Sequence, residues 1–233
     1  MTAIDVAPRN RLLAALPADE LRSLLSGGGL DCISLSAGGA LLEQGKPIDF
    51  IYFPIDSVIS FMVVASQRMT LEVGLVGDEG LAGVGVALGS MVSPMHAVVR
   101  RGGLALRMPA EAFLAGLRNH PHLAQAVARH AHGLMVQAAQ AAFCSHFHLL
   151  EARLARSLLM MHDRVQSNGL HLTHEILGLA LGVRRVGITK AATSLQQRGL
   201  ISYNRGEIRI LDREGLEVAS CACYALVRKL ADA

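Results

Sequence analysis

The sequence predicts an α+β protein in which an antiparallel β domain is followed by helices. Between residues 30 and 108, short runs of β-branched and aromatic residues alternate with turn residues. No proline occurs after Pro121, and helical periodicity prevails from there to residue 198. Of the 233 residues, 52% are hydrophobic, so the chain is long and apolar enough to bury a large core.

The N-terminal half begins with a short predicted helix, because Pro17 suits a first helical position. The apolar stripe of this helix consists of Leu16, Leu21, Leu24 and Leu25. Six β-type runs follow, at Cys32–Leu35, Phe50–Phe53, Val58–Val64, Thr70–Val76, His96–Arg100 and Leu104–Met108. Six runs in under eighty residues leave little room for crossover helices, which favours an antiparallel sandwich or barrel.

A short helix at Pro109–Leu117 and a long helix from Pro121 to about residue 148 are predicted next. Positions 123, 127, 130, 134, 137, 141, 144 and 148 follow a four-three spacing, which is typical of a helix–helix contact. We expect this stripe to pair two copies of the chain in a symmetric homodimer. Its expected dimer residues are Leu123, Val127, His130, Leu134 and Ala141. The alternative is that the helix packs on its own β domain.

After a helix at Leu149–Arg164, the sequence predicts a helix-turn-helix. Thr173 is a good N-cap for a short helix, and Gly182 suits a tight turn that needs a positive φ. A second helix is expected at Arg184–Arg198. Its apolar face consists of Ile188, Ala191, Ala192 and Leu195, and its outer face is basic. Such a pair places its second helix in the major groove of DNA.

Residues 200–211 predict a β-hairpin that would form the wing of a winged helix-turn-helix, with Arg205 at its tip. Residues 184–209 contain six basic residues and a single acidic one, Glu207, a net charge of +5 in a chain whose net charge is +3. This local charge favours contact with phosphates. The alternative is an ordinary helical hairpin with a solvated basic face.

The whole chain, from about residue 10 to residue 224, resembles the Crp/Fnr family of bacterial transcription regulators, named after the cyclic-AMP receptor protein and the fumarate–nitrate regulator. The resemblance is strongest in EARLARSLLMMHDRV, LTHEILGLALGVRRVGITKAATSLQQRGLI and the hairpin after them, and weaker in GGALLEQGKPIDFIYFPIDSVISF. It implies a β-roll like a cyclic-nucleotide-binding domain at 1–118, a dimerisation helix at 119–148 and a winged helix-turn-helix at 149–233. It also implies a cytoplasmic homodimer that binds palindromic double-stranded DNA and contacts RNA polymerase.

By this resemblance, Arg185 occupies the position of the family's guanine-contacting arginine. Lys190 occupies a second basic contact position, and Arg184 that of a phosphate contact. The family's usual base-contacting glutamate is replaced by Val186, whose side chain suits a thymine methyl group rather than cytosine. The expected DNA-binding residues are Thr173, Arg184, Arg185, Val186, Ile188, Thr189, Lys190 and Arg205.

The resemblance also places a candidate effector pocket in the β-roll, with Glu79, Ser93 and Arg100 as its residues. Cyclic-nucleotide-binding members place an arginine next to the position of Ser93, which Pro94 follows here. A buried phosphate without a counter-charge is costly, so we expect no cyclic-nucleotide binding in the usual mode. An effector-gated sensor of the same fold, binding haem or a nucleotide, is the alternative. Its candidate haem ligands are His96, His130 and His146, although surface or contact roles are favoured for the three His-x-His pairs of this region.

Four cysteines are too few and too unevenly spaced to predict a disulfide framework. Only Cys32 lies in the N-terminal half, which excludes the four thiolate ligands of an N-terminal iron–sulfur centre. Cys221 and Cys223 have one residue between them, where a zinc site usually has two to four. We therefore expect no metal site, and two buried cysteines on the last helix; a redox-reactive pair is the alternative.

Other function classes lack their sequence signals. There is no signal-peptide pattern at the N-terminus, and no apolar run approaches the length of a membrane span. There is also no phosphate-binding Gly-x-x-x-x-Gly-Lys loop, no HExxH motif and no catalytic triad in its usual sequence context. We expect a cytoplasmic protein that is not an enzyme.

Overall fold

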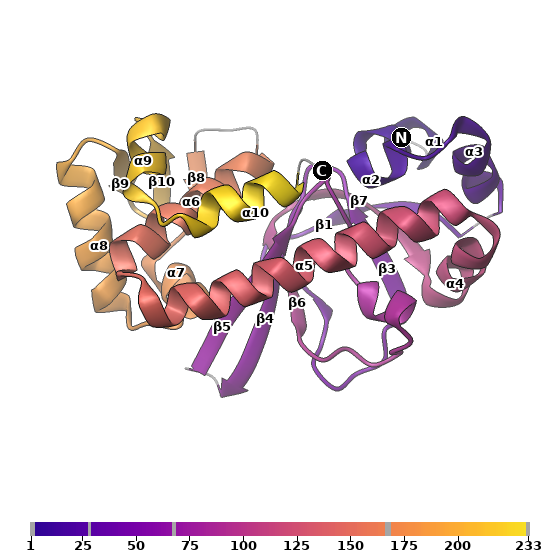
Figure 1. Cartoon of the computed structure of the whole chain (residues 1–233), viewed down its shortest axis with the longest axis horizontal. Coiled ribbons are helices and arrows are strands. Elements are labelled where there is room, and N and C mark those ends of the chain that lie inside the picture. Colours follow the sequence, from indigo (N-terminus) through magenta and orange to yellow (C-terminus); the bar gives the residue numbers. More distant parts are fainter. Residues whose placement is uncertain (1–2, 28, 67–68, 166–168, 232–233) are drawn as a thin grey trace. The chain divides into compact units, whose positions relative to one another are not determined.

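The computed structural model describes residues 3–27, 29–66, 69–165 and 169–231. It confirms the α+β class (Figure 1). The chain forms two compact units. The β unit comprises residues 1–61 and 76–134, and the C-terminal unit comprises residues 62–75 and 135–233. The expected division after residues 118 and 148 stays a prediction.

Short helical segments open the chain: α1 (Ala3–Val6), the 3-10 turn η1 (Ala7–Arg9), α2 (Arg11–Ala14) and α3 (Ala18–Ser26). Pro17 is the residue before α3 rather than its first residue. The fully buried side chain of Asn10 caps α2 by accepting a hydrogen bond from the Leu13 amide. Its amide group donates to the carbonyl oxygens of Pro54 and Gly80, at 2.8 and 3.0 Å, which ties this N-terminal segment to the rest of the β unit.

The six predicted strands are all present, and a seventh, β2, joins them. One sheet has the order β1-β7-β3, from Asp31–Leu35, Gly103–Pro109 and Phe50–Pro54. The other has the order β2-β6-β4-β5, from Ala40–Leu42, His96–Arg101, Val58–Ser66 and Met69–Val76. β7 pairs antiparallel with both β1 and β3. Together with the 3-10 turn η2 (Val84–Leu88), these strands bury a core in which Phe53 meets Phe113 edge to face, with centroids 6.2 Å apart.

Helices α4 (Ala110–Asn119), α5 (Pro121–Phe147) and α6 (Leu150–Val165) follow, as predicted. The side chains of Leu123, Val127 and Ala141 on α5 are 0%, 2% and 7% exposed, so they are already covered by this chain. His130 is half-buried, and its Nε2 lies 2.9 Å from the carbonyl oxygen of Leu81. Leu134 is half-buried as well. The expectation of a dimer contact is therefore corrected for buried Leu123, Val127 and Ala141, and it stays a prediction for His130 and Leu134.

The C-terminal unit has helices α7 (His174–Leu181), α8 (Arg185–Gln197), α9 (Arg213–Ala219) and α10 (Cys223–Ala231). Its sheet has the order β8-β10-β9, from Gly169–His171, Glu207–Ile210 and Ile201–Asn204. The predicted hairpin is β9 and β10, and β8 was not predicted. Buried Arg153 of α6 donates a hydrogen bond to the Leu181 carbonyl oxygen at 2.5 Å, which fixes the end of α7 on α6. Among the described residues, no helix is long and apolar enough to cross a membrane.

Candidate nucleic-acid interface

The first helix of the helix-turn-helix, α7, has defined caps at both ends. The Thr173 hydroxyl oxygen accepts a hydrogen bond from the Ile176 amide at 3.2 Å, as expected of an N-cap. Gly182 ends the helix with φ +66°, the left-handed conformation that the sequence predicts for this position. A Cβ atom on Gly178 would lie 3.0 Å from the Val183 carbonyl oxygen, so a glycine lets the turn fold closely over α7.

The second helix, α8, separates an apolar face from a polar one. Its apolar face is buried as predicted and consists of Ile188, Ala191, Ala192 and Leu195. Its outer face is exposed and contains Arg185, Val186, Thr189 and Lys190, with Arg184 at the N-cap. Ile188 is 0% exposed, so its assignment as a DNA-contacting residue is corrected: its side chain packs in the core of the unit. Val186, by contrast, is 61% exposed.

His174, which the sequence did not predict as a site residue, contacts Thr189 on the outer face of α8. Its ring stacks on Tyr203 of β9, with centroids 4.1 Å apart, and its Nδ1 lies 3.0 Å from the Thr189 hydroxyl oxygen. The Thr189 hydroxyl donates to the Arg185 carbonyl oxygen at 3.1 Å. Nδ1 must therefore carry the proton and donate to Thr189. Burial, and secondarily the charge of Arg185, lower the pKa of His174, which keeps the ring neutral at neutral pH.

The wing turns tightly between β9 and β10. Arg205 lies in the turn with φ +47°, followed by Gly206 with φ +89°, and the Arg205 side chain is exposed as expected. Arg209 on β10 is exposed as well. Arg198 forms an ion pair with Glu151 of α6 at 2.6 Å, so one of the six basic residues of this region has an internal partner. The other five are exposed: Arg184, Arg185 and Lys190 at α8, and Arg205 and Arg209 in the wing.

Each residue of the candidate effector pocket forms a polar contact within the β unit. Glu79 accepts a hydrogen bond from the Gly77 amide at 2.9 Å. Buried Ser93 donates through its hydroxyl to the Met95 carbonyl oxygen at 2.6 Å. Arg100 lies 3.4 Å from the Ser60 hydroxyl. The pocket stays a prediction.

The candidate haem ligands lie on two elements, His96 on β6 and His130 and His146 on α5. The Nε2 atom of His130 contacts the Leu81 backbone, and its ring packs against Gly80, where a Cβ atom would collide with it. His96 begins β6, and His146 is exposed near the end of α5. Haem ligation by any of the three stays a prediction that no contact of the described residues supports.

Comparison with known proteins agrees with this geometry. Residues 152–219 match the family model of the Crp-like helix-turn-helix domain. The fold is similar to that of FixK2 from Bradyrhizobium japonicum, at 13% identity and TM-score 0.71 over 83% of this chain and 98% of that one. It is also similar to a protein described as a regulator of the Crp/Fnr family from Eubacterium rectale, at 18% identity and TM-score 0.70 over 91% and 98% of the two chains.

A third similar structure is the c-di-GMP-responsive global regulator CLP from Xanthomonas campestris, at 14% identity and TM-score 0.69 over 83% of this chain and 99% of that one. No match was found among curated protein sequences. These likenesses show the fold of the chain, and the family model identifies residues 152–219 as a Crp-like helix-turn-helix domain.

Proposed function

We propose that this chain, a regulator of the Crp/Fnr type by its fold and by its helix-turn-helix domain, binds palindromic DNA sequence-specifically as a homodimer. The observation that supports this most directly is the two-sided α8. Its apolar face is buried, whereas Arg185, Val186 and Lys190 are exposed on a helix of the length that enters a major groove.

Sequence recognition is assigned to the exposed residues of α8. The guanidinium of Arg185 presents the paired donors that match the O6 and N7 atoms of guanine. Val186 offers an apolar surface to a thymine methyl group, and Lys190 a second cation. Arg184 at the helix start and Arg205 in the wing are positioned to contact phosphates, which supply affinity but little sequence preference.

Dimerisation is assigned to the exposed side of α5. One stripe of exposed residues on α5 has a three-four spacing: Gln125, Ala128, His132, Met135, Ala139, Ala142 and His146. Met135, at the centre of this stripe, is 67% exposed, which is unusual for a large apolar side chain. Pairing two copies through this stripe would bury it and would give the two-fold symmetry that a palindromic site requires.

Cyclic-nucleotide binding in the family's usual mode is not part of the proposal. The Ser93 hydroxyl already donates to the Met95 carbonyl oxygen, and neither neighbour of Ser93, Val92 or Pro94, is the arginine that this mode uses. A phosphate there would lack the charge-assisted hydrogen bonds that make such sites strong.

The test is a selection of binding sites from random duplex DNA, with purified protein at near-physiological salt and no added ligand. We expect an enriched palindrome with half-sites roughly one helical turn apart. Arg185→Ala should weaken binding to that site about 10- to 100-fold and relax the preference at a single base pair. The control, Arg118→Ala, changes an exposed arginine of α4 and should bind like the wild type.

Two results would contradict the proposal. One is the absence of any enriched sequence, both without ligand and in repeats with cyclic nucleotides or haem. The other is an equal loss of affinity for specific and random DNA in Arg185→Ala, which would make Arg185 a phosphate contact only.

A further inference from the structure

We propose that Cys144, His148, Cys221 and Cys223 form a structural zinc site in the C-terminal unit. Their ligand atoms, three thiol sulfurs and an imidazole nitrogen, all lie within 4.8 Å of one another. Three cysteines and one histidine are a donor set that structural zinc sites use. None of the four is among the expected DNA-binding residues, and the sequence predicted no metal site.

Two segments that are distant in the sequence supply the ligands. Cys144 lies in the last turn of α5, and His148 is the first residue after that helix. Because His148 comes four positions after Cys144, both side chains point from the same side of the chain. Cys223 is the first residue of α10, and Cys221 lies in the link between α9 and α10. The expectation that both cysteines lie on the last helix is therefore correct only for Cys223, although both are buried.

Three of the distances between the ligand atoms are close to those of a tetrahedron around one ion. Zinc–sulfur and zinc–nitrogen bonds of about 2.3 and 2.05 Å place two sulfurs roughly 3.8 Å apart and a sulfur and a nitrogen roughly 3.5 Å apart. The Cys144 and Cys221 sulfurs are 3.4 Å apart. The His148 Nδ1 atom lies 3.5 Å from the Cys144 sulfur and 3.7 Å from the Cys223 sulfur. The spacing leaves room for a single ion rather than for a cluster of several irons.

The surroundings compensate the charge of the proposed site. Three thiolates, a neutral histidine and Zn²⁺ carry a net charge of −1, and a buried charge needs a partner. Arg156 of α6 is 8% exposed, and its Nε atom has no hydrogen-bond partner among the described residues. Its positive charge acts on the thiols of Cys144 and Cys223.

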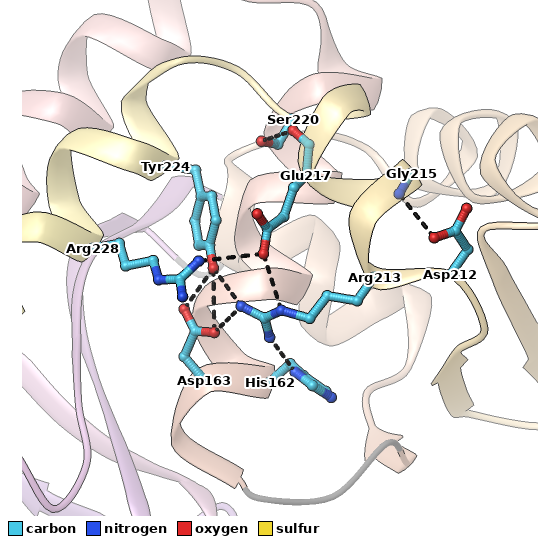
Figure 2. Close-up of polar contacts among 9 residues, drawn as sticks. All are labelled: His162, Asp163, Asp212, Arg213, Gly215, Glu217, Ser220, Tyr224 and Arg228. Atoms are coloured by element: carbon cyan, nitrogen blue, oxygen red, sulfur yellow. Dashed lines mark hydrogen bonds and ion pairs between the residues drawn. The ribbon is translucent and has the colours of Figure 1, made fainter.

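A polar network holds the segment that contributes Cys221 and Cys223 (Figure 2). Arg213 of α9 donates hydrogen bonds to Asp163 of α6 at 2.6 Å and to the Tyr224 hydroxyl oxygen at 2.7 Å. The Tyr224 hydroxyl donates in turn to Asp163 at 3.0 Å. Because Tyr224 follows Cys223 directly, the network fixes one pair of ligands against α6.

The site is closed, since all four positions of the tetrahedron are taken by protein atoms and three of the four ligands are buried. A closed site has no position for a substrate or water, which favours a structural role over catalysis. Its ion would join the end of α5 to the α9–α10 link, two segments that meet beside α6. Binding would therefore stabilise the C-terminal unit.

The first experiment measures metal in protein purified without chelators or a metal-affinity tag. We expect about one zinc ion per chain by mass spectrometry of the elements. Cys223→Ser and His148→Gln should lose most of this zinc. Their matched controls, Cys32→Ser and His146→Gln, change a cysteine of the β unit and an exposed histidine two residues from the site, and should keep it.

The second experiment uses the wild-type chain, so that it remains decisive if a variant fails to fold. Zinc is removed with a chelator and replaced by Co²⁺, whose tetrahedral thiolate sites give intense charge-transfer and d–d absorption. We expect these bands, and a higher thermal midpoint with zinc than without it. Substoichiometric zinc together with the absence of these cobalt bands would overturn the proposal. So would a chain two mass units lighter, with a Cys144–Cys221 disulfide and no bound metal.

Discussion

Replacing Ile188 with alanine should destabilise the C-terminal unit without changing which bases the protein prefers. The Ile188 side chain is 0% exposed on the inner face of α8. The substitution removes three carbon groups, worth about 0.8 kcal/mol each in burial, and leaves a cavity, which together cost about 2–4 kcal/mol. Val186 lies two residues away on the outer face, and its side chain is 61% exposed. Val186→Ala should therefore change stability by less than about 0.5 kcal/mol.

The two variants are compared in urea unfolding followed by circular dichroism, and in site selection at a temperature where both are folded. Ile188→Ala should lower the unfolding midpoint and return the wild-type site. Val186→Ala should keep the midpoint and lose discrimination at one base pair. The reasoning is refuted if Ile188→Ala unfolds like the wild type or shifts the base preference, because either result would place its side chain at the DNA surface.

Two further substitutions test the local physics of the helix-turn-helix. Gly182→Ala should cost about 1–2 kcal/mol, since Gly182 has φ +66°, whereas Gly133→Ala, inside α5 with open space around it, should be neutral or stabilising in the same unfolding assay. The lowered pKa of His174 means that the unfolded chain binds this proton more readily, so stability should fall as the pH drops below about 6.5. His174→Gln should flatten this slope in unfolding measured from pH 7 to 5, and exposed His171→Gln should not; an unchanged slope in His174→Gln would contradict the assignment.

The elements that the sequence predicted are those with a strong local pattern. The strands with at least four residues of alternating or continuous apolar character were all found, whereas Ala40–Leu42 and Gly169–His171 are three residues long and too short to show a period. The buried contacts of Asn10 were equally invisible, because they join residues 44 and 70 positions apart.

The long helix shows where periodicity alone is insufficient. Small and apolar residues recur on more than one side of α5, so the sequence offers two stripes of nearly equal quality. One contains Leu123 and Val127 and is buried within the chain, and the other contains Met135 and is exposed. Which stripe faces its own domain depends on tertiary packing, for example the contact of His130 with Leu81, and no local signal reports that.

The helix-turn-helix was predictable because its signals are local: an N-cap, a glycine with positive φ and a basic outer face. Ile188 was nevertheless assigned to DNA, because a family position was transferred although the helical period already placed the residue on the apolar face. His174 was missed for the opposite reason. Its role depends on Tyr203 and Thr189, which lie on other elements and meet it only in the fold.

The spacing of cysteines and histidines in the sequence does not predict the four proposed zinc ligands. The one-residue interval between Cys221 and Cys223 argues against a metal as long as the pair is considered alone, and His148 belongs to the histidines for which the sequence favours a surface or helix-contact role. The fold pairs Cys221 with Cys144, 77 positions earlier, and adds His148 to the pair. A spacing rule applies to ligands that share one turn, and not to ligands that two separate helices bring together. In this chain, the packing of α5 and α10 against α6 sets the distances between the ligands. Such a site is therefore identified from the distances between sulfur and nitrogen atoms, and from a buried arginine beside them whose charge the thiolates would balance.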